Sequence, residues 1–217
     1  MIEETKYYGV YESWRDKKRM LFTKSQDGKN FFNELMFDDF LEFDPRRSKL
    51  GAAIVKRISF FPIKNNSKIL YLGAAHGYTP SKISDIATKG VIYCLDFAPR
   101  VVRDLYFICE ERENMIPLLA DANDPDSYAN RIEQVDIIYE DVAQKTQIEI
   151  LFKNLRFLKN NGYVMIAVKA RSIDVTRRPQ EIFDEVERKL NQKLKVIDKK
   201  LLDPLEKDHC FFVCQKK

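Results

Sequence analysis

Charged side chains with catalytic potential follow several short apolar runs in this 217-residue chain. Asp96 and Asp141 each end an apolar run typical of a strand, and Lys169 follows the run at residues 164–168. Because ligands bind at the carboxyl ends of strands in open α/β sheets, we expect these side chains to line one cleft. A lysine there can accept a proton, and a nearby carboxylate keeps an ammonium charged and oriented.

A glycine turn follows the first of these runs. Gly73 and Gly77 are two of only seven glycines, which indicates backbone that bends sharply or approaches a ligand closely. Ala75 replaces the middle glycine of the dinucleotide fingerprint, so an ordinary tight turn is an alternative. Asp96 has the position and spacing of an acid that binds both hydroxyls of an adenosine ribose, or else it caps the next helix. Phe97 beside it can stack on the adenine ring.

Polar side chains after the third and fourth runs complete the predicted pocket. Asp121, followed by Ala122, can accept a hydrogen bond from an adenine amino group or act as a turn residue. Gln144 can hold the polar amino-acid end of a cofactor. Glu140 precedes Asp141, but alternation points only one of the two toward a given face, which disfavours a two-carboxylate mechanism.

Basic residues lie in the two segments expected beside this cleft: Arg46, Arg47, Lys49, Arg171, Arg177 and Arg178. Such residues suit a phosphate backbone, and a solvated charge run is the alternative for the arginines. The formal net charge of +4 permits a nucleic-acid partner and predicts weak RNA binding by the isolated chain.

Strand and helix alternate from residue 68 onward, which predicts a doubly wound, Rossmann-like α/β sheet. Strands are expected at residues 69–72, 91–97, 115–119, 137–140 and 163–168. Helices are expected with Thr79 as N-cap and Gly90 as the stop, from Pro99, over the stretch containing residues 148–155, and from Pro179. The last two strands, 195–201 and 210–215, are too close for a crossover and predict an antiparallel pair with one reversed strand.

The N-terminal residues have a different pattern. Short aromatic and β-branched runs at residues 7–14 and 19–23 predict hairpins of a small antiparallel sheet. Ser48 is expected to cap a helix carrying Leu50, Ile54, Ile58 and Phe61. We therefore expect a small β domain at 1–47 and a larger α/β domain at 48–217.

Composition excludes several classes of protein. No apolar run approaches the roughly 18 residues of a membrane span, and the first residues lack the pattern of a signal peptide. The four cysteines have no CxxC spacing and there are only two histidines, so no metal site is expected. Reduced, buried thiols in a cytosolic protein are the expected state.

Longer motifs resemble the fibrillarin family, at residues 47–50, 69–75, 77–81, 136–144, 168–176 and 206–209. The runs Asp-Val-Ala-Gln at 141–144 and Lys-Ala-Arg-Ser-Ile-Asp at 169–174 are the most specific. The resemblance implies a class I methyltransferase, dependent on S-adenosylmethionine, that methylates ribose 2′-hydroxyls of pre-rRNA and tRNA. It further implies three kinds of partner: box C/D guide RNA, a Nop-domain scaffold protein and a kink-turn-binding ribosomal-type protein. It also implies a cytoplasmic enzyme of the archaeal type.

The resemblance also implies site residues. The implied cofactor contacts are Gly73, Ala74, Gly77, Tyr78, Thr79, Asp96, Phe97, Asp121, Ala122, Asp141, Val142, Ala143 and Gln144. The implied catalytic group is Lys49, Asp141 and Lys169, with His209 as a fourth member. His76 and Tyr78 stand where the family usually has a small residue and a threonine, so the Tyr78 contact is expected through its backbone. Asp96 replaces a frequent glutamate, which keeps the acid and shortens its reach.

We hypothesise that Lys169 accepts the proton or stabilises the oxyanion, while Lys49 positions the ribose or phosphate. Two lysines that are close together and partly desolvated would each resist protonation, so one can become a base. Two other functions stay open: methylation of a small molecule or protein on the same scaffold, and a non-catalytic scaffold of an RNA particle. A nicotinamide-dependent oxidoreductase is least favoured, because the middle glycine is missing.

Overall fold

The larger sheet of the computed structural model, which describes residues 1–15 and 17–217, has the strand order β11-β12-β10-β9-β6-β7-β8. Its strands are β6 (Lys68–Leu72), β7 (Val91–Asp96), β8 (Met115–Leu119), β9 (Val135–Glu140), β10 (Leu158–Lys169), β11 (Leu194–Leu201) and β12 (His209–Lys216). Strand β12 runs antiparallel to both β10 and β11, and the other pairs are parallel. The predicted doubly wound sheet with one reversed strand is confirmed.

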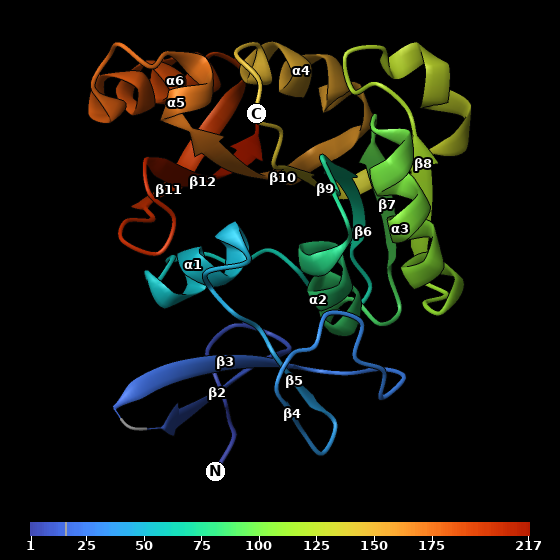
Figure 1. The fold of residues 1–217 in the computed structure, drawn as a ribbon. Helices are drawn as coiled ribbons and strands as arrows, with labels where there is room; N and C mark the ends of the chain where they lie inside the picture. The colour runs from blue at the N-terminus through green and yellow to red at the C-terminus, as the bar shows by residue number, and fades with distance from the viewer. Residues whose placement is uncertain (16) are drawn as a thin grey trace.

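Helices cover both faces of this sheet (Figure 1). The helices on one face are α1 (Lys49–Val55), α2 (Tyr78–Ile86) and α3 (Pro99–Glu110). The helices on the other are α4 (Gln147–Asn154), α5 (Ala170–Ile173) and α6 (Pro179–Lys193), and short 3₁₀ turns are η1 (Pro125–Arg131) and η2 (Leu155–Phe157). Alternation along each strand divides the apolar side chains, so that Tyr71 and Tyr139 pack on the first face and Leu70 and Ile138 on the second.

The chain changes direction beside β6. It runs from β6 through β7 to β8 at one edge, and then returns to place β9 on the other side of β6. Leu72 and Glu140 are register partners at the carboxyl ends of β6 and β9, so Gly73 and Asp141 leave the sheet side by side. Such a point of reversal is where open α/β sheets bind ligands.

A second, antiparallel sheet precedes α1 in the chain and lies next to α1 and α2 in Figure 1. Its strands are β1 (Glu3–Glu4), β2 (Val10–Arg15), β3 (Lys18–Lys24), β4 (Met36–Phe37) and β5 (Phe40–Glu42), in the order β1-β2-β3-β5-β4. Val10 and Leu21 from this sheet share one apolar cluster with Ile83 and Ile86 of α2. The two sheets are thus joined by a common core.

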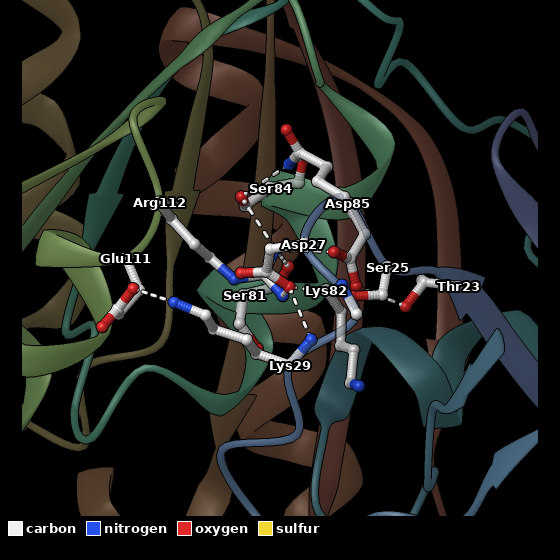
Figure 2. A network of polar contacts seen from close by, with 12 residues as sticks. Thr23, Ser25, Asp27, Lys29, Ser81, Lys82, Ser84, Asp85, Glu111 and Arg112 are labelled. Carbon is white, nitrogen blue, oxygen red and sulfur yellow. Dashed lines mark hydrogen bonds and ion pairs between the residues drawn. The ribbon is translucent and has the colours of Figure 1, made fainter. Parts of the chain in front are cut away.

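Buried charges reinforce this junction (Figure 2). Lys82 Nζ of α2 lies 2.7 Å from Glu34 Oε1, and both side chains are almost fully buried. Arg112 donates to Asp85 at 2.6 Å, and the Thr23 hydroxyl donates to the same carboxylate at 2.7 Å. Because these partners come from the N-terminal segment, α2 and the end of α3, their pairing fixes the N-terminal segment on the α/β sheet.

Two predicted helix limits are wrong. Helix α2 begins at Tyr78 with Gly77 as its N-cap, so Thr79 is inside the helix, and its hydroxyl bonds Ser48 instead of capping. The helix ends at Ile86, before Gly90. A Cβ at Gly90 would meet the Ser67 carbonyl at 2.0 Å, so this glycine permits a close backbone approach at the start of β7.

Other predicted limits differ as well. Ser48 caps α1 as predicted, accepting a hydrogen bond from the Gly51 amide at 3.2 Å, but α1 ends at Val55, before Ile58 and Phe61. Strand β10 is longer than predicted at both ends, β9 begins two residues earlier, and β7 ends before Phe97. Strand β8 and the starts of α3 and α6 agree with the sequence prediction.

All four cysteines are free and buried, as expected. Among the described residues, no group of three or more His, Cys, Asp or Glu side chains is arranged to hold a metal ion. No helix within residues 1–15 and 17–217 combines the length and apolar character needed to cross a membrane.

Candidate active site

The turn after β6 packs tightly against the end of β9. Gly73 has φ +82°, and a Cβ there would lie 2.6 Å from the Asp141 carbonyl oxygen. Gly77 has φ +91°, and a Cβ there would lie 2.9 Å from Leu105 of α3. Both glycines therefore meet two demands that other residues cannot, a left-handed backbone and a close neighbour. The turn holds the start of α2 against the sheet edge.

Asp96 connects this turn to the next helix. Its Oδ2 accepts from the Ala75 amide at 3.0 Å, and its Oδ1 accepts from the Ala98 amide at 3.0 Å. The carboxylate thus fixes the glycine turn and the residue before α3. The capping alternative is wrong, because the N-cap is Ala98 and no side chain caps that helix. Phe97 beside it is 66% exposed, which leaves its ring open to a planar ligand.

The segments after β8 and β9 meet beside the turn. Asp121 Oδ1 accepts from the Asn123 amide at 2.8 Å, and the Asn123 side chain donates to Gln144 Oε1 at 3.5 Å. Ala122 is buried, and its carbonyl accepts from Asn154 of α4 at 2.9 Å. Asn123 and Asn154 are site residues that the sequence did not predict. The signal for Asn154 was a polar residue among apolar neighbours on its helix.

The remaining implied cofactor positions adjoin the same turn. Ala74 is buried and its amide donates to the Leu95 carbonyl at 2.9 Å, while Val142 lies 3.0 Å from the place of a Gly73 Cβ. Ala143 is exposed, and Thr79 is buried at the start of α2. The structure therefore brings the ends of β6, β7, β8 and β9 to one edge.

Lys49 and Asp141 form the charged pair of this edge. Lys49 is the first residue of α1, and its Nζ lies 3.2 Å from Asp141 Oδ2, with both side chains about a quarter exposed. Burial lowers the pKa of Lys49, but the carboxylates of Asp141 and Glu206 outweigh burial and raise it overall. This direction agrees with the expectation that Asp141 keeps its lysine partner charged, and it opposes the effect that desolvation alone would have on Lys49.

Lys169 and His209 lie on adjacent strands at the same edge of the sheet. They are register partners where β10 and β12 meet, and Lys169 is exposed while His209 is buried. His209 Nδ1 donates a hydrogen bond to the Lys207 carbonyl at 2.7 Å and lies 4.0 Å from Glu206 Oε2. Glu206 lies in the motif at residues 206–209, and the sequence predicted no role for it. Its charge acts on Lys49 and its carboxylate approaches His209, so it belongs to this edge.

The flanking arginines are mostly paired with acids. Arg46 donates to Asp44 at 3.1–3.2 Å, Arg171 donates to Asp208 at 3.1 Å, and Arg177 donates to Glu185 at 2.6 Å. Arg178 is exposed. Since exposed ion pairs are weak, a phosphate can compete for these guanidinium groups. Their contact with a phosphate backbone stays a prediction.

Comparison with known families agrees with this geometry. A family model described as Fibrillarin matches residues 1–217. The fibrillarin-like rRNA/tRNA 2′-O-methyltransferase of Methanocaldococcus jannaschii is 50% identical over 215 residues, which cover 95% of this chain and 94% of that protein.

Solved structures are similar to this chain as well. The fibrillarin pre-rRNA processing protein of Methanococcus jannaschii has a TM-score of 0.94 at 48% identity, covering 100% of this chain and 97% of that one. A fibrillarin/Nop5p complex gives 0.91 at 39% identity, covering 99% and 100%. Aeropyrum pernix fibrillarin, solved with natively bound S-adenosyl-L-methionine, gives 0.90 at 38% identity, covering 99% and 97%.

Proposed function

The chain belongs to the fibrillarin family, and on that premise we propose that it transfers a methyl group from S-adenosylmethionine to a ribose 2′-hydroxyl of rRNA and tRNA. The observation that carries the proposal is the Lys49–Asp141 pair, 3.2 Å apart, beside the glycine turn. Lys169 and His209 enter the same edge from the neighbouring strands. This arrangement provides charged groups next to a nucleoside pocket, which methyl transfer to a nucleic acid requires.

The residues present fit the cofactor. The Gly73 turn is a cradle that a single Cβ would fill, since that atom would meet the Asp141 carbonyl. We propose that Asp96 and Phe97 hold the ribose and adenine, that Asp121 and Ala122 hold the adenine edge, and that Gly77, Tyr78 and Thr79 lie along the amino-acid end with Gln144. Asp141, Val142 and Ala143 would complete the pocket. The bound cofactor supplies an activated methyl group on a sulfonium.

The side chains divide the remaining work between them. Asp141 keeps Lys49 charged, so Lys49 is suited to hold a phosphate or ribose oxygen and unsuited to accept a proton. We assign removal of the 2′-hydroxyl proton to Lys169, whose amine lies at the open end of β10. His209, with Nδ1 bonded to the Lys207 carbonyl, presents its other nitrogen as an acceptor for a hydrogen bond.

Partners follow from the same family. A solved fibrillarin is in complex with Nop5p, which supports a Nop-domain scaffold protein as the partner of this chain. We further propose that box C/D guide RNA and a kink-turn-binding ribosomal-type protein complete the particle and select the target. The small net charge of +4 supports this dependence, because the chain alone offers little electrostatic attraction for RNA.

We also propose domain limits and a cellular location for the protein. Residues 1–47 form the N-terminal β domain and residues 48–217 the methyltransferase domain, a division supported by the two separate sheets. The protein works in the cytoplasm, which its four free cysteines support because disulfides form in oxidising compartments.

The deciding experiment measures labelled methyl transfer from S-adenosylmethionine. The chain is assembled with a Nop-domain protein, a kink-turn-binding protein and a guide RNA, and is given a matched target RNA. We expect label in that RNA and none when the target nucleotide carries a 2′-deoxy substitution. Equal labelling of the deoxy RNA, or labelling only of free small molecules or proteins, would contradict the proposal. Absence of cofactor binding in calorimetry would favour the non-catalytic scaffold.

A further inference from the structure

We infer that Tyr78 is a positioning residue, which fastens residues 44–48 to the start of α2 and thereby holds Lys49 opposite Asp141. The inference rests on the proposed function for its catalytic consequence, but its geometry is independent of any ligand. Tyr78 is the first residue of α2, directly after the glycine turn. Its side chain contacts residues of the N-terminal segment.

The hydroxyl of Tyr78 anchors the chain just before α1. It accepts a hydrogen bond from the Asp44 amide at 2.8 Å. Burial raises the pKa of Tyr78, against the opposing effects of this bond and of the Arg47 charge, so the phenol stays neutral at physiological pH. A backbone amide held by a side chain 34 residues away fixes the path of the segment at that point.

The ring of Tyr78 holds a second point of the same segment. The Arg47 guanidinium lies 4.3 Å from the ring centroid, close enough for a cation–π interaction. Arg47 also donates to the Phe32 carbonyl at 3.0 Å, and the Phe32 ring packs edge-on against Tyr78 at 5.3 Å. The arginine is thus held over the ring from two sides, one residue before the cap of α1.

The neighbouring residue of α2 completes the attachment. The Thr79 hydroxyl donates to Ser48 Oγ at 2.9 Å, and both side chains are buried. Ser48 Oγ in turn caps α1 by accepting from the Gly51 amide. Consecutive residues 78 and 79 therefore bind residues 44, 47 and 48, and the next residue in the chain is Lys49.

The attachment leaves Lys49 little freedom. A Cβ at Gly51 would lie 3.2 Å from Pro45 Cα, so the segment before α1 also packs on the helix itself. A shift of residues 44–48 would move α1 and carry the Lys49 ammonium away from Asp141. Tyr78 thus couples the glycine turn, which adjoins the cofactor pocket, to the charged group that faces the substrate.

The test is Tyr78→Phe, which removes the acceptor of the Asp44 amide and keeps the ring. We expect kcat for methyl transfer in the assembled particle to fall about 3- to 10-fold, the effect of losing one hydrogen bond. The Kd for S-adenosylmethionine, from calorimetry, should stay within about twofold. Tyr106→Phe, a change on the exposed side of α3, serves as the matched control and should alter neither quantity.

A second readout does not depend on activity. The pKa of Lys49, followed by NMR of ¹³C-labelled lysine and assigned with Lys49→Arg, should fall in Tyr78→Phe, because a looser pair weakens the raising effect of Asp141. Phe32→Leu, which keeps an apolar side chain but removes the edge-on ring contact, should lower it in the same direction. A change in general stability alone would leave this pKa where it is.

Each outcome separates the inference from the function. A Tyr78→Phe protein that loses cofactor affinity with kcat intact would make the Tyr78 hydroxyl a cofactor contact and overturn the inference. An unchanged kcat together with an unchanged Lys49 pKa would overturn it as well. If the wild-type particle transfers no methyl group, the proposed function fails, and the Lys49 pKa in the two variants still decides whether Tyr78 positions Lys49.

Discussion

Two clusters of lysine, arginine and acid side chains serve this molecule in opposite ways. The junction cluster, Glu34–Lys82 and Asp85–Arg112, is dry, with its charged groups at most 8% exposed. Figure 2 shows Lys82, Asp85 and Arg112 of this cluster among the polar contacts around them. The edge cluster, Lys49–Asp141 with Lys169 and His209, keeps its ion pair about a quarter exposed and its second lysine open. The first cluster is closed and structural, whereas the second has atoms free for a substrate.

Burial explains the difference. At the junction, burial raises the pKa of Asp85 despite Arg112 and lowers the pKa of Lys82 despite Glu34, so desolvation opposes both charges. At the sheet edge, burial is weaker than the carboxylates, and the pKa of Lys49 rises. A buried charge is strongly destabilising without its partner. A partly exposed ion pair is weak, so one of its groups can exchange its partner for a phosphate or hydroxyl.

The largest expected effect is on the edge cluster. Lys169→Ala removes the proposed proton acceptor, and we expect turnover to fall about 10²–10⁴-fold, the usual contribution of general-base assistance. Because Lys169 is exposed, the free energy of unfolding should change by less than about 0.5 kcal/mol. Methyl transfer, cofactor calorimetry and denaturant unfolding check this. Lys195→Ala, an exposed lysine of β11, is the control, and full turnover in cofactor-bound Lys169→Ala would refute the assignment.

The junction cluster should respond in stability. Lys82→Met leaves the Glu34 carboxylate buried without its partner, and we expect a loss of about 3–5 kcal/mol in the free energy of unfolding, measured with denaturant. Adding Glu34→Gln should recover much of this, because the amide oxygen can still accept from the Phe32 amide.

Lys159→Ala breaks an exposed pair with Asp136 and is the matched control, with an expected cost of about 0–1 kcal/mol. Equal costs at the two sites would contradict the distinction between a buried and an exposed ion pair.

A smaller effect concerns Glu140, which precedes Asp141 but points into the opposite core. Burial and the Asp141 charge raise its pKa well above the ordinary 4.5, against the lowering effect of the Gln147 side chain. The folded chain then binds the proton more tightly than the unfolded chain. This contribution to stability is complete below about pH 4.5 and declines as pH rises through the folded pKa.

Glu140→Gln should remove that decline, which reaches at most about 1.4 kcal/mol per pH unit. Denaturant unfolding between pH 4 and 8 measures the slope, with Glu3→Gln on the exposed β1 as control. Parallel slopes for wild type and Glu140→Gln would contradict the expectation.

The sequence was sufficient to predict the strands of the larger sheet, because the patterns that indicate them are local. Apolar runs followed by proline mark β7 with α3, and Pro179 marks α6. The start of α2 was missed because Thr79 has the side chain of a cap, and only the fold reveals that Ser48 takes its hydroxyl. Gly77 is the N-cap instead, in a left-handed backbone conformation and without a side-chain cap bond, so no capping side chain marks this position in the sequence.

The sequence predicted the site residues that lie at the ends of strands. Asp96, Asp141 and Lys169 follow apolar runs, so their common edge follows from topology. Pairing did not follow, since Lys49 comes from a segment 92 positions before Asp141 in the chain. The same reason hid the parts played by Asn123, Glu206 and the Tyr78 side chain, whose partners are distant in sequence and meet only through the packing of several elements.

The core shared by the two sheets limits how this chain can be shortened. Gly9 lies so close to Ile86 that a Cβ there would be 3.0 Å from its side chain, and Val10 and Leu21 cover the same part of α2. A truncation that begins at residue 48 would expose this apolar surface and the buried Lys82 and Asp85 to water. The α/β part of the chain is therefore not a transplantable module, and an engineered shorter protein would need a substitute cover for α2.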